Sequence, residues 1–231
     1  MKKMVLISTA IFMTVMGALL SGAGELRAAG MSVGANAWYV QWDRTPSNDT
    51  DIDPGLMYGP VAGFDWGRNW SLTSVFLTGN FKAKMPPSSG GMELNYRRYD
   101  SDTTLNYAVL KWFKMFGGFK YIRYELKGGN LDEFGTVLMP FEGGDIKHTA
   151  YGPGAGIGIT LPLADSLFVL GNFSVMYLFG KDILPGEPAA RFNGTGYNAT
   201  MGLAYYLDSI STTVTAGVRY QYFKDGKPLG C

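Results

Sequence analysis

The stretch Thr212–Phe223, TTVTAGVRYQYF, carries the clearest structural signal in this sequence. Every second residue in it is apolar or aromatic, and these residues are Val214, Ala216, Val218, Tyr220 and Tyr222. The residues between them are small or polar, namely Thr213, Thr215, Gly217, Arg219 and Gln221. An alternation with period two predicts a β-strand with one apolar and one polar face.

The same alternation recurs along the chain and predicts nine strands in all. Besides Thr212–Phe223 they are Ser32–Trp42, Leu56–Trp66, Ser71–Lys82, Thr104–Phe113, Phe119–Lys127, Tyr151–Leu161, Leu167–Phe179 and Tyr197–Leu207. Their polar faces are mostly Gly, Ala, Ser, Thr and Asn, whereas a soluble sheet shows Lys and Glu to water. Small residues suit the crowded interior of a narrow barrel, and the wide apolar face suits contact with lipid.

The connections between these strands alternate strictly in length. The short ones are Gly67–Trp70, Lys114–Gly117, Ala164–Ser166 and Asp208–Ser211. The long ones are Thr45–Pro54, Met85–Asp102, Gly128–His148 and Gly180–Gly196. Outer-membrane barrels show this asymmetry. In lipid the sheet must also close, because an open edge leaves backbone groups without hydrogen bonds.

The N-terminal segment has the pattern of an export signal. Lys2 and Lys3 precede an apolar run to Leu20, and Ser21-Gly22-Ala23 offers small residues for cleavage. We predict a signal peptide over residues 1–23, with a boundary that could extend to residue 30. The alternative is a membrane-anchor helix, for which the apolar run is slightly shorter than the roughly 20 residues that a span needs.

Composition excludes several classes of function. The chain has 231 residues, 20 Lys and Arg against 19 Asp and Glu, one Cys and one His. The near-zero net charge argues against nucleic-acid binding. A single Cys and a single His exclude a disulfide framework and most zinc sites. At 46% hydrophobic and 17% charged residues, the chain is also too apolar to be disordered.

Taken together, the leader, the strands of about ten residues, the small inner face and the loop asymmetry resemble the small bacterial outer-membrane β-barrel proteins, the OmpA-like, OmpX-like and OmpW-like group. The resemblance implies an all-β, antiparallel up-and-down transmembrane barrel of eight to ten strands over residues 31–224, located in the outer membrane. It implies outer-membrane lipid, lipopolysaccharide and the barrel-assembly machinery as partners. We expect a monomer with no cofactor and no nucleic-acid partner.

The predicted count of nine is odd, whereas single-chain bacterial barrels have an even number of strands. One explanation is truncation of a tenth strand, so that residues 225–231 are the start of an outside loop. The other is that one of the nine is not a barrel strand and that Val214–Tyr222 closes the barrel. We favour truncation, because only then does the alternation of loop lengths stay consistent.

The expected function is a non-enzymatic structural or surface-interaction role, with a small solute pore as the alternative. A second alternative is an enzyme at the barrel rim that acts on lipid A or peptides through His148, with Asp145 three residues before it. A His oriented by a carboxylate is a general base. The spacing His-x-Ser of a lipid A deacylase would need Ser where Ala150 stands, so we expect an ordinary loop histidine.

Four isolated charges are predicted to face the lumen: Asp65, Arg123, Glu125 and Arg219. They could gate a pore, but we expect them mainly to fill the barrel and fix its register, since small barrels are usually packed shut.

Two loop regions carry weaker signals. Asp49, Asp51 and Asp53 could bind Ca²⁺ or bridge lipopolysaccharide, although a solvated acidic loop is the expectation. Arg97 and Arg98 lie among aromatic residues and could contact lipid phosphates, or this segment could extend a strand pair above the membrane, which we favour.

Overall fold

Almost all of the chain that the structure describes is extended. The computed structural model describes residues 5–19, 30–45, 51–67, 69–84, 93–126, 146–183 and 188–228, with the backbone alone for residues 5–19, 42–45, 51, 83–84, 93–94 and 225–228. The strands are β1 (Val5–Leu19), β2 (Gly30–Thr45), β3 (Asp51–Ile52), β4 (Gly55–Gly67), β5 (Trp70–Lys84), β6 (Glu93–Leu110), β7 (Phe113–Leu126), β8 (Ile146–Ala164), β9 (Leu167–Ile183), β10 (Ala190–Leu207) and β11 (Thr212–Pro228). No helix within these ranges has the length and apolar character needed to cross a membrane.

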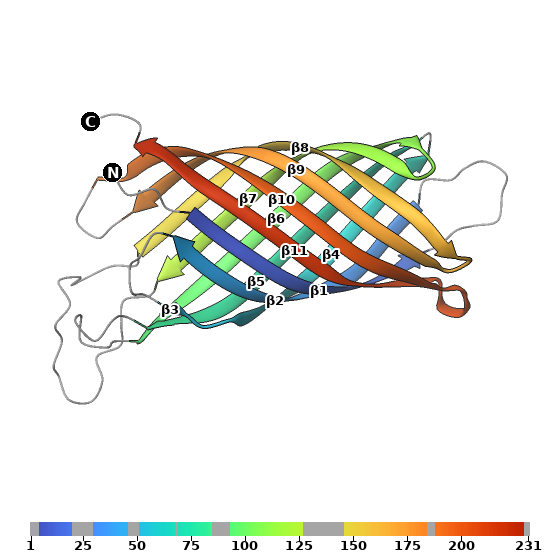
Figure 1. Ribbon diagram of the computed structural model, residues 1–231, viewed down its shortest axis with the longest axis horizontal. Helices are drawn as coiled ribbons and strands as arrows, with labels where there is room; N and C mark the ends of the chain where they lie inside the picture. The colour runs from blue at the N-terminus through green and yellow to red at the C-terminus, as the bar shows by residue number, and fades with distance from the viewer. Residues whose placement is uncertain are drawn as a thin grey trace.

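These strands form one sheet that closes on itself. Their order is β3-β5-β4-β2-β1-β11-β10-β9-β8-β7-β6, and a further pairing of β5 with β6 joins the two ends. Apart from the two-residue β3, each strand pairs antiparallel with the strands before and after it in the chain, and β11 pairs with β1. The described residues therefore form an antiparallel up-and-down barrel of ten strands, seen as a tube in Figure 1.

The described connections at one end of the barrel are short (Figure 1). They lie between β4 and β5, β6 and β7, β8 and β9, and β10 and β11, where the 3-10 helix η2 (Asp208–Ile210) makes the turn. Gly67 and Asn69, both with φ of 73°, and Ser211, with φ of 47°, supply left-handed residues that tight turns require. We call this the short-turn end, and the opposite end the long-loop end.

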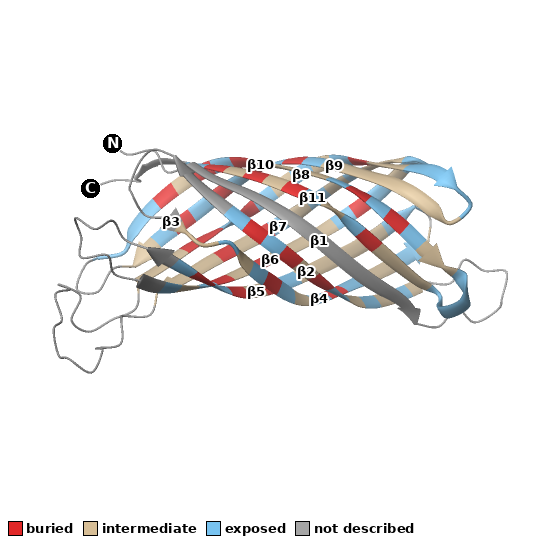
Figure 2. Ribbon diagram, turned by 60° about the horizontal axis from the view of Figure 1, so that its bottom comes forward, coloured by how far each residue is buried: buried red, intermediate tan, exposed pale blue. Residues whose placement is uncertain are grey.

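Exposed and buried residues alternate along the strands (Figure 2). On β9, Phe173, Val175, Tyr177 and Phe179 are exposed, while the residues between them are buried. Because successive side chains of a strand point to opposite faces, the exposed set covers the outside of the barrel and the buried set fills the lumen. The predicted faces of this strand are thus confirmed.

The sequence predicts a lumen lined mostly by small residues, but the structure shows such a lining in only one half of the barrel. Its short-turn half agrees: Ser74 and Thr103 share a hydrogen bond of 3.0 Å, and Asn172 donates one of 3.1 Å to Thr200. The long-loop half instead holds two apolar clusters. One contains Ile122, Ala150, Met176, Leu178, Phe192 and Phe223. The other contains Trp38, Val40, Met57, Leu77 and Phe81.

All nine predicted strands are confirmed, but one turn and several strand ends are corrected. The turn predicted at Lys114–Gly117 lies at Lys111–Trp112, and Gly117 and Gly118 sit inside β7. A Cβ on Gly118 would meet the Thr103 carbonyl oxygen at 2.5 Å, so this glycine serves a close strand approach rather than a turn. Strand β6 begins at Glu93 and pairs with β5 and β7, so the segment around Arg97 extends the sheet, as favoured above.

The tenth strand of the barrel is β1, which belongs to the predicted signal peptide. Its backbone pairs with β11 on one side, from Val5↔Lys224 to Gly17↔Thr212, and with β2 on the other. The barrel thus has an even number of strands, as the resemblance implies, and its tenth strand comes from the N-terminal segment. The truncation favoured above, with a tenth strand after Cys231, is therefore not needed to close the described sheet. Cleavage of residues 1–23 stays a prediction.

Candidate functional site

Five charged side chains meet inside the barrel near the middle of their strands. Arg98, Asp100 and Asp102 lie two residues apart on β6, so they share its inner face. Lys120 comes from β7 and Arg219 from β11. We call these five residues the ion-pair layer. Their side chains are between 1% and 7% exposed, except that of Asp102 at 24%.

Ion pairs connect the whole layer. The Asp100 carboxylate forms ion pairs with Arg98 Nη2 and with Lys120 Nζ, both at 2.7 Å. Asp102 receives Lys120 Nζ at 2.9 Å and Arg219 Nη2 at 2.8 Å. Because charges taken out of water must be paired, this mutual satisfaction is what lets five ionised groups share a lumen.

The contact between Asp102 and Arg219 spans the lumen from wall to wall. In the ring of ten strands, β6 and β11 are five positions apart in either direction, which places them on opposite walls. A carboxylate from one wall and a guanidinium from the other therefore meet at 2.8 Å. At this height the lumen is crossed by side chains rather than open.

The Arg219 guanidinium is fixed on further sides by groups from neighbouring strands. Its Nε donates to Asn198 Oδ1 on β10 at 2.8 Å, and its Cζ lies 4.4 Å from the ring centroid of Trp38 on β2. The Gln221 amide oxygen, in the orientation that satisfies both groups, accepts from Arg219 at 2.7 and 3.0 Å. The layer thus reaches five strands, β2, β6, β7, β10 and β11.

Of the charges predicted to face the lumen, Arg219 lies in the layer, whereas Arg123 and Glu125 do not. On β7 the inward residues are Lys120 and Ile122, at 3% and 2% exposed. Arg123 and Glu125 have the opposite parity and form an ion pair with each other on the outer face. Their predicted inward orientation is wrong, because the prediction placed the polar face of the strand inward, whereas the apolar Ile122 of this strand packs in a lumen cluster and its charged neighbours face outward.

Asp65 has the parity of the inner face but lies at the short-turn end, where it is exposed. Its Oδ1 accepts a hydrogen bond of 2.7 Å from the Gly67 backbone nitrogen. It therefore shapes the turn between β4 and β5 and takes no part in the ion-pair layer.

His148 lies on β8 at the long-loop end and faces inward. Its Nδ1 is 2.6 Å from Asp182 Oδ1 on β9, and its ring stacks on Phe192 at 5.0 Å. Its carboxylate partner is thus Asp182, while the predicted partner, Asp145, lies outside the described residues. No hydrogen bond between His148 and a hydroxyl or thiol occurs among the residues that the structure describes.

The acidic residues of the first long loop are only partly described. Asp49 and the side chain of Asp51 lie outside the described residues, and Asp51 belongs to β3, which pairs with Lys84 on β5. Within the described ranges no three acidic, His or Cys side chains gather as a metal site.

Reasoning from the sequence missed four of the five layer residues, although a signal for them exists. Arg98, Asp100 and Asp102 alternate with Tyr99 and Ser101, which is the pattern of a strand with charges on one face. The strand predicted from the sequence begins only at Thr104, and residues 85–102 count as a long connection, so the alternation of these charges is not assigned to an inner face. Three charges of mixed sign at spacing two mark a paired inner face better than a loop.

Comparisons with known proteins found similar structures but no matching sequence family. No model of a known protein family matches the sequence, and no curated protein matches it. Among solved structures, the β domain of the Bordetella autotransporter BrkA is similar, at 11% identity over 96% of this chain and 99% of that chain, with a TM-score of 0.49. The outer-membrane protease OmpT from Escherichia coli (14% identity, 96% and 94% covered, TM-score 0.41) and the outer-membrane protein OprG from Pseudomonas aeruginosa (13%, 96% and 95%, 0.35) are also similar. All three TM-scores are below 0.5, so the assignment of the fold rests on the strand pairing described above.

Proposed function

We propose that this protein is a bacterial outer-membrane barrel with a structural or surface-interaction role, and that its lumen is closed to solutes and carries no catalytic activity. The observation that carries the proposal is the contact of Asp102 with Arg219 between opposite walls at 2.8 Å. A lumen crossed by paired, buried charges offers a solute no continuous water path.

The residues beyond the layer support closure. Toward the long-loop end, Ile122, Met176 and Phe223 are each at most 8% exposed, as expected for a packed interior. Toward the short-turn end, hydrogen bonds join Thr200, Ser74 and their neighbours across adjacent strands. These contacts fill and register the barrel, which is the role we assign to its interior.

A gated pore is the second candidate, and one observation favours it. The groups that cross the lumen are long, flexible Lys and Arg side chains held by ion pairs, so they could part without breaking the sheet. Asp102 is also 24% exposed, the most accessible member of the layer. A pore of this kind would conduct in brief openings.

Conductance in planar bilayers tests both candidates. We expect no resolvable steps from the wild-type barrel, and clear steps from the double variant Asp102→Ala/Arg219→Ala, which removes one anion and one cation. The double variant is preferred because removing only one partner of a buried pair costs about 3–5 kcal/mol. Arg123→Ala, on the outer face, is the matched control and should stay silent.

Two results would count against the closed barrel. Frequent openings of the wild-type protein would favour the gated pore. A double variant that folds, as judged by its gel mobility before and after heating, yet stays silent would show that the ion-pair layer does not close the lumen.

A further inference from the structure

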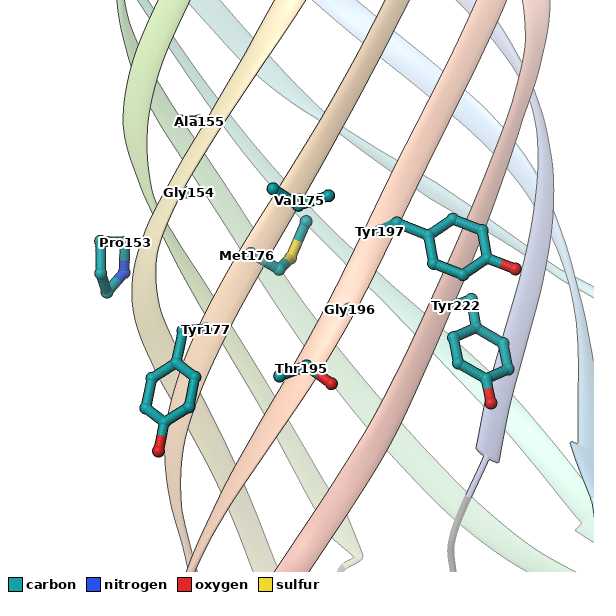
Figure 3. Close-up of a pocket in the computed structure, with 10 residues that line it drawn as sticks. All are labelled: Pro153, Gly154, Ala155, Val175, Met176, Tyr177, Thr195, Gly196, Tyr197 and Tyr222. Carbon is teal, nitrogen blue, oxygen red and sulfur yellow. The ribbon is translucent and has the colours of Figure 1, made fainter.

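The outer wall of the barrel carries a groove over β8, β9, β10 and β11. Its volume is about 640 Å³ (Figure 3). Small side chains form its floor, among them Ala155, Val175 and Thr195, and all three are exposed on the outer face. A groove lined by small side chains on a lipid-facing wall suits a narrow acyl chain better than a polar solute.

Tyrosines border this groove. Tyr197 and Tyr222 stack at 5.0 Å on one side, and Tyr177 stands on the other. In Figure 3 the hydroxyls of Tyr177 and Tyr222 extend toward the strand ends at the long-loop end. The Tyr177 hydroxyl accepts a hydrogen bond of 2.8 Å from Asn193. Tyrosines with an apolar body and a polar tip mark the boundary between hydrocarbon and headgroups.

Three basic residues lie on the same outer face. Two of them, Lys181 and Arg191, lie beyond the groove toward the long-loop end, whereas Lys224 is the register partner of Thr195 at the edge of the groove. Lys181, Arg191 and Lys224 share the outward parity of Tyr177, Thr195 and Tyr222, and all three are exposed. Lys181 and Arg191 are direct register partners on β9 and β10. Like charges directly opposite each other destabilise a sheet, and an anion bound between them would offset their repulsion. No ion pair among the described residues includes any of the three.

The height of these groups matches the lipid headgroups. Lys181 comes fourteen residues after Leu167, the first residue of β9 (181 − 167). At about 3.3 Å per residue and a tilt of about 40°, it lies about 35 Å above the short-turn boundary, whereas the apolar band of an outer-membrane barrel is about 25 Å tall. By the same arithmetic Tyr177, ten residues after Leu167, lies close to the upper edge of that band.

We propose that this wall binds lipid A, with an acyl chain in the groove, a phosphate between Lys181 and Arg191, and Lys224 as a further cation at the edge of the groove. The inference rests on the proposed location in the outer membrane. It assigns the lipid to one wall of the barrel, where apolar groove, tyrosine border and cations follow one another in the order of acyl chain, ester region and phosphate. Charge-assisted hydrogen bonds to phosphate oxygens supply the specificity.

Native mass spectrometry of the full chain in detergent, with added lipid A, tests the site. We expect wild-type protein to retain lipid A that bears both phosphates, and to retain dephosphorylated lipid A and phosphatidylglycerol less well. The variant Lys181→Gln/Arg191→Gln/Lys224→Gln should bind lipid A about tenfold more weakly or worse. Val175→Trp, which fills the groove, should also weaken binding. Lys111→Gln removes an exposed charge at the short-turn end and should bind as the wild type does.

The outcomes separate this inference from the proposed function. If every variant inserts into vesicles and the triple variant binds lipid A as tightly as the wild type, the site is wrong and the barrel stands. Equal retention of phosphorylated and dephosphorylated lipid A would likewise overturn it. If the wild-type protein does not insert into vesicles at all, both the membrane location and this site fail.

Discussion

Glycines inside this barrel make room for aromatic rings on the neighbouring strand. Phe192 lies opposite Gly180 in register, and Phe223 lies opposite Gly196. A Cβ on Gly180 would meet the Phe192 ring at 2.0 Å. A ten-stranded lumen can therefore hold large rings only because the facing position carries no side chain. The inward glycines are part of the packing and not a sign of flexibility.

This complementarity predicts a specific rescue. Gly180→Val should destabilise the barrel by overpacking, by about 1–3 kcal/mol. Phe192→Ala should cost about 3–5 kcal/mol through the cavity that it leaves. The double variant should lose clearly less than the sum, because the new methyl groups occupy the vacated space. Urea unfolding in detergent measures all three, and Gly30→Val, with nothing within 4 Å of its Cβ, is the neutral control. Additive losses would contradict the pairing.

At the scale of elements, closure depends on the first strand. Without β1, the long edges of β2 and β11 would each lose an antiparallel partner over most of their length. In hydrocarbon such an edge leaves backbone groups unpaired, at several kcal/mol for each group. In the structure Val5–Leu19 forms a strand of the barrel, whereas cleavage of the predicted signal peptide would remove it. The closed ten-stranded barrel and this cleavage therefore exclude each other.

Deleting residues 1–23 should therefore prevent closure. We expect such a chain, refolded in detergent, to lose the compact form that migrates differently before and after heating. A chain lacking only residues 1–4, which precede β1, should fold as the full chain does. If the chain without residues 1–23 forms a heat-modifiable barrel of the same stability, β1 is dispensable for closure.

The strands could be predicted because the period-two alternation of side chains reflects two different environments, the outside of the barrel and its lumen. Along β9 every second residue meets the outside and the others meet the lumen, so the pattern is strong enough to be read without a structure. Contacts between opposite walls leave no such trace. Arg219 and Asp102 are 117 positions apart, and nothing in either strand states that they touch. The outward Arg123 shows that polarity alone does not identify the inner face of a strand, because the apolar Ile122 beside it packs in the lumen.

On the outside of the barrel, the type of side chain changes with its position along the barrel axis. On β10, the outward residues run Tyr197, Ala199, Met201, Leu203 and Tyr205, so an apolar stretch lies between two tyrosines. At the short-turn end Trp66, Trp70 and Trp112 are 47%, 43% and 48% exposed. Barrels that span a bilayer carry aromatic girdles on either side of an apolar band, because aromatic side chains with a polar tip prefer the two interfaces between hydrocarbon and headgroups.

This ordering makes the cost of a charge depend on its height. Met201, 64% exposed and midway between Tyr197 and Tyr205, should lie near the bilayer midplane, whereas Leu163, 61% exposed, lies one residue before the end of β8 at the short-turn end. We expect Met201→Arg to lower the free energy of unfolding in phosphatidylcholine vesicles by about 2–4 kcal/mol and Leu163→Arg to lower it by about 0–1 kcal/mol. Urea titrations of tryptophan fluorescence measure both. Because the two side chains are almost equally exposed to solvent, equal losses would mean that no bilayer surrounds this wall, and the membrane orientation derived from the sheet would fall with it.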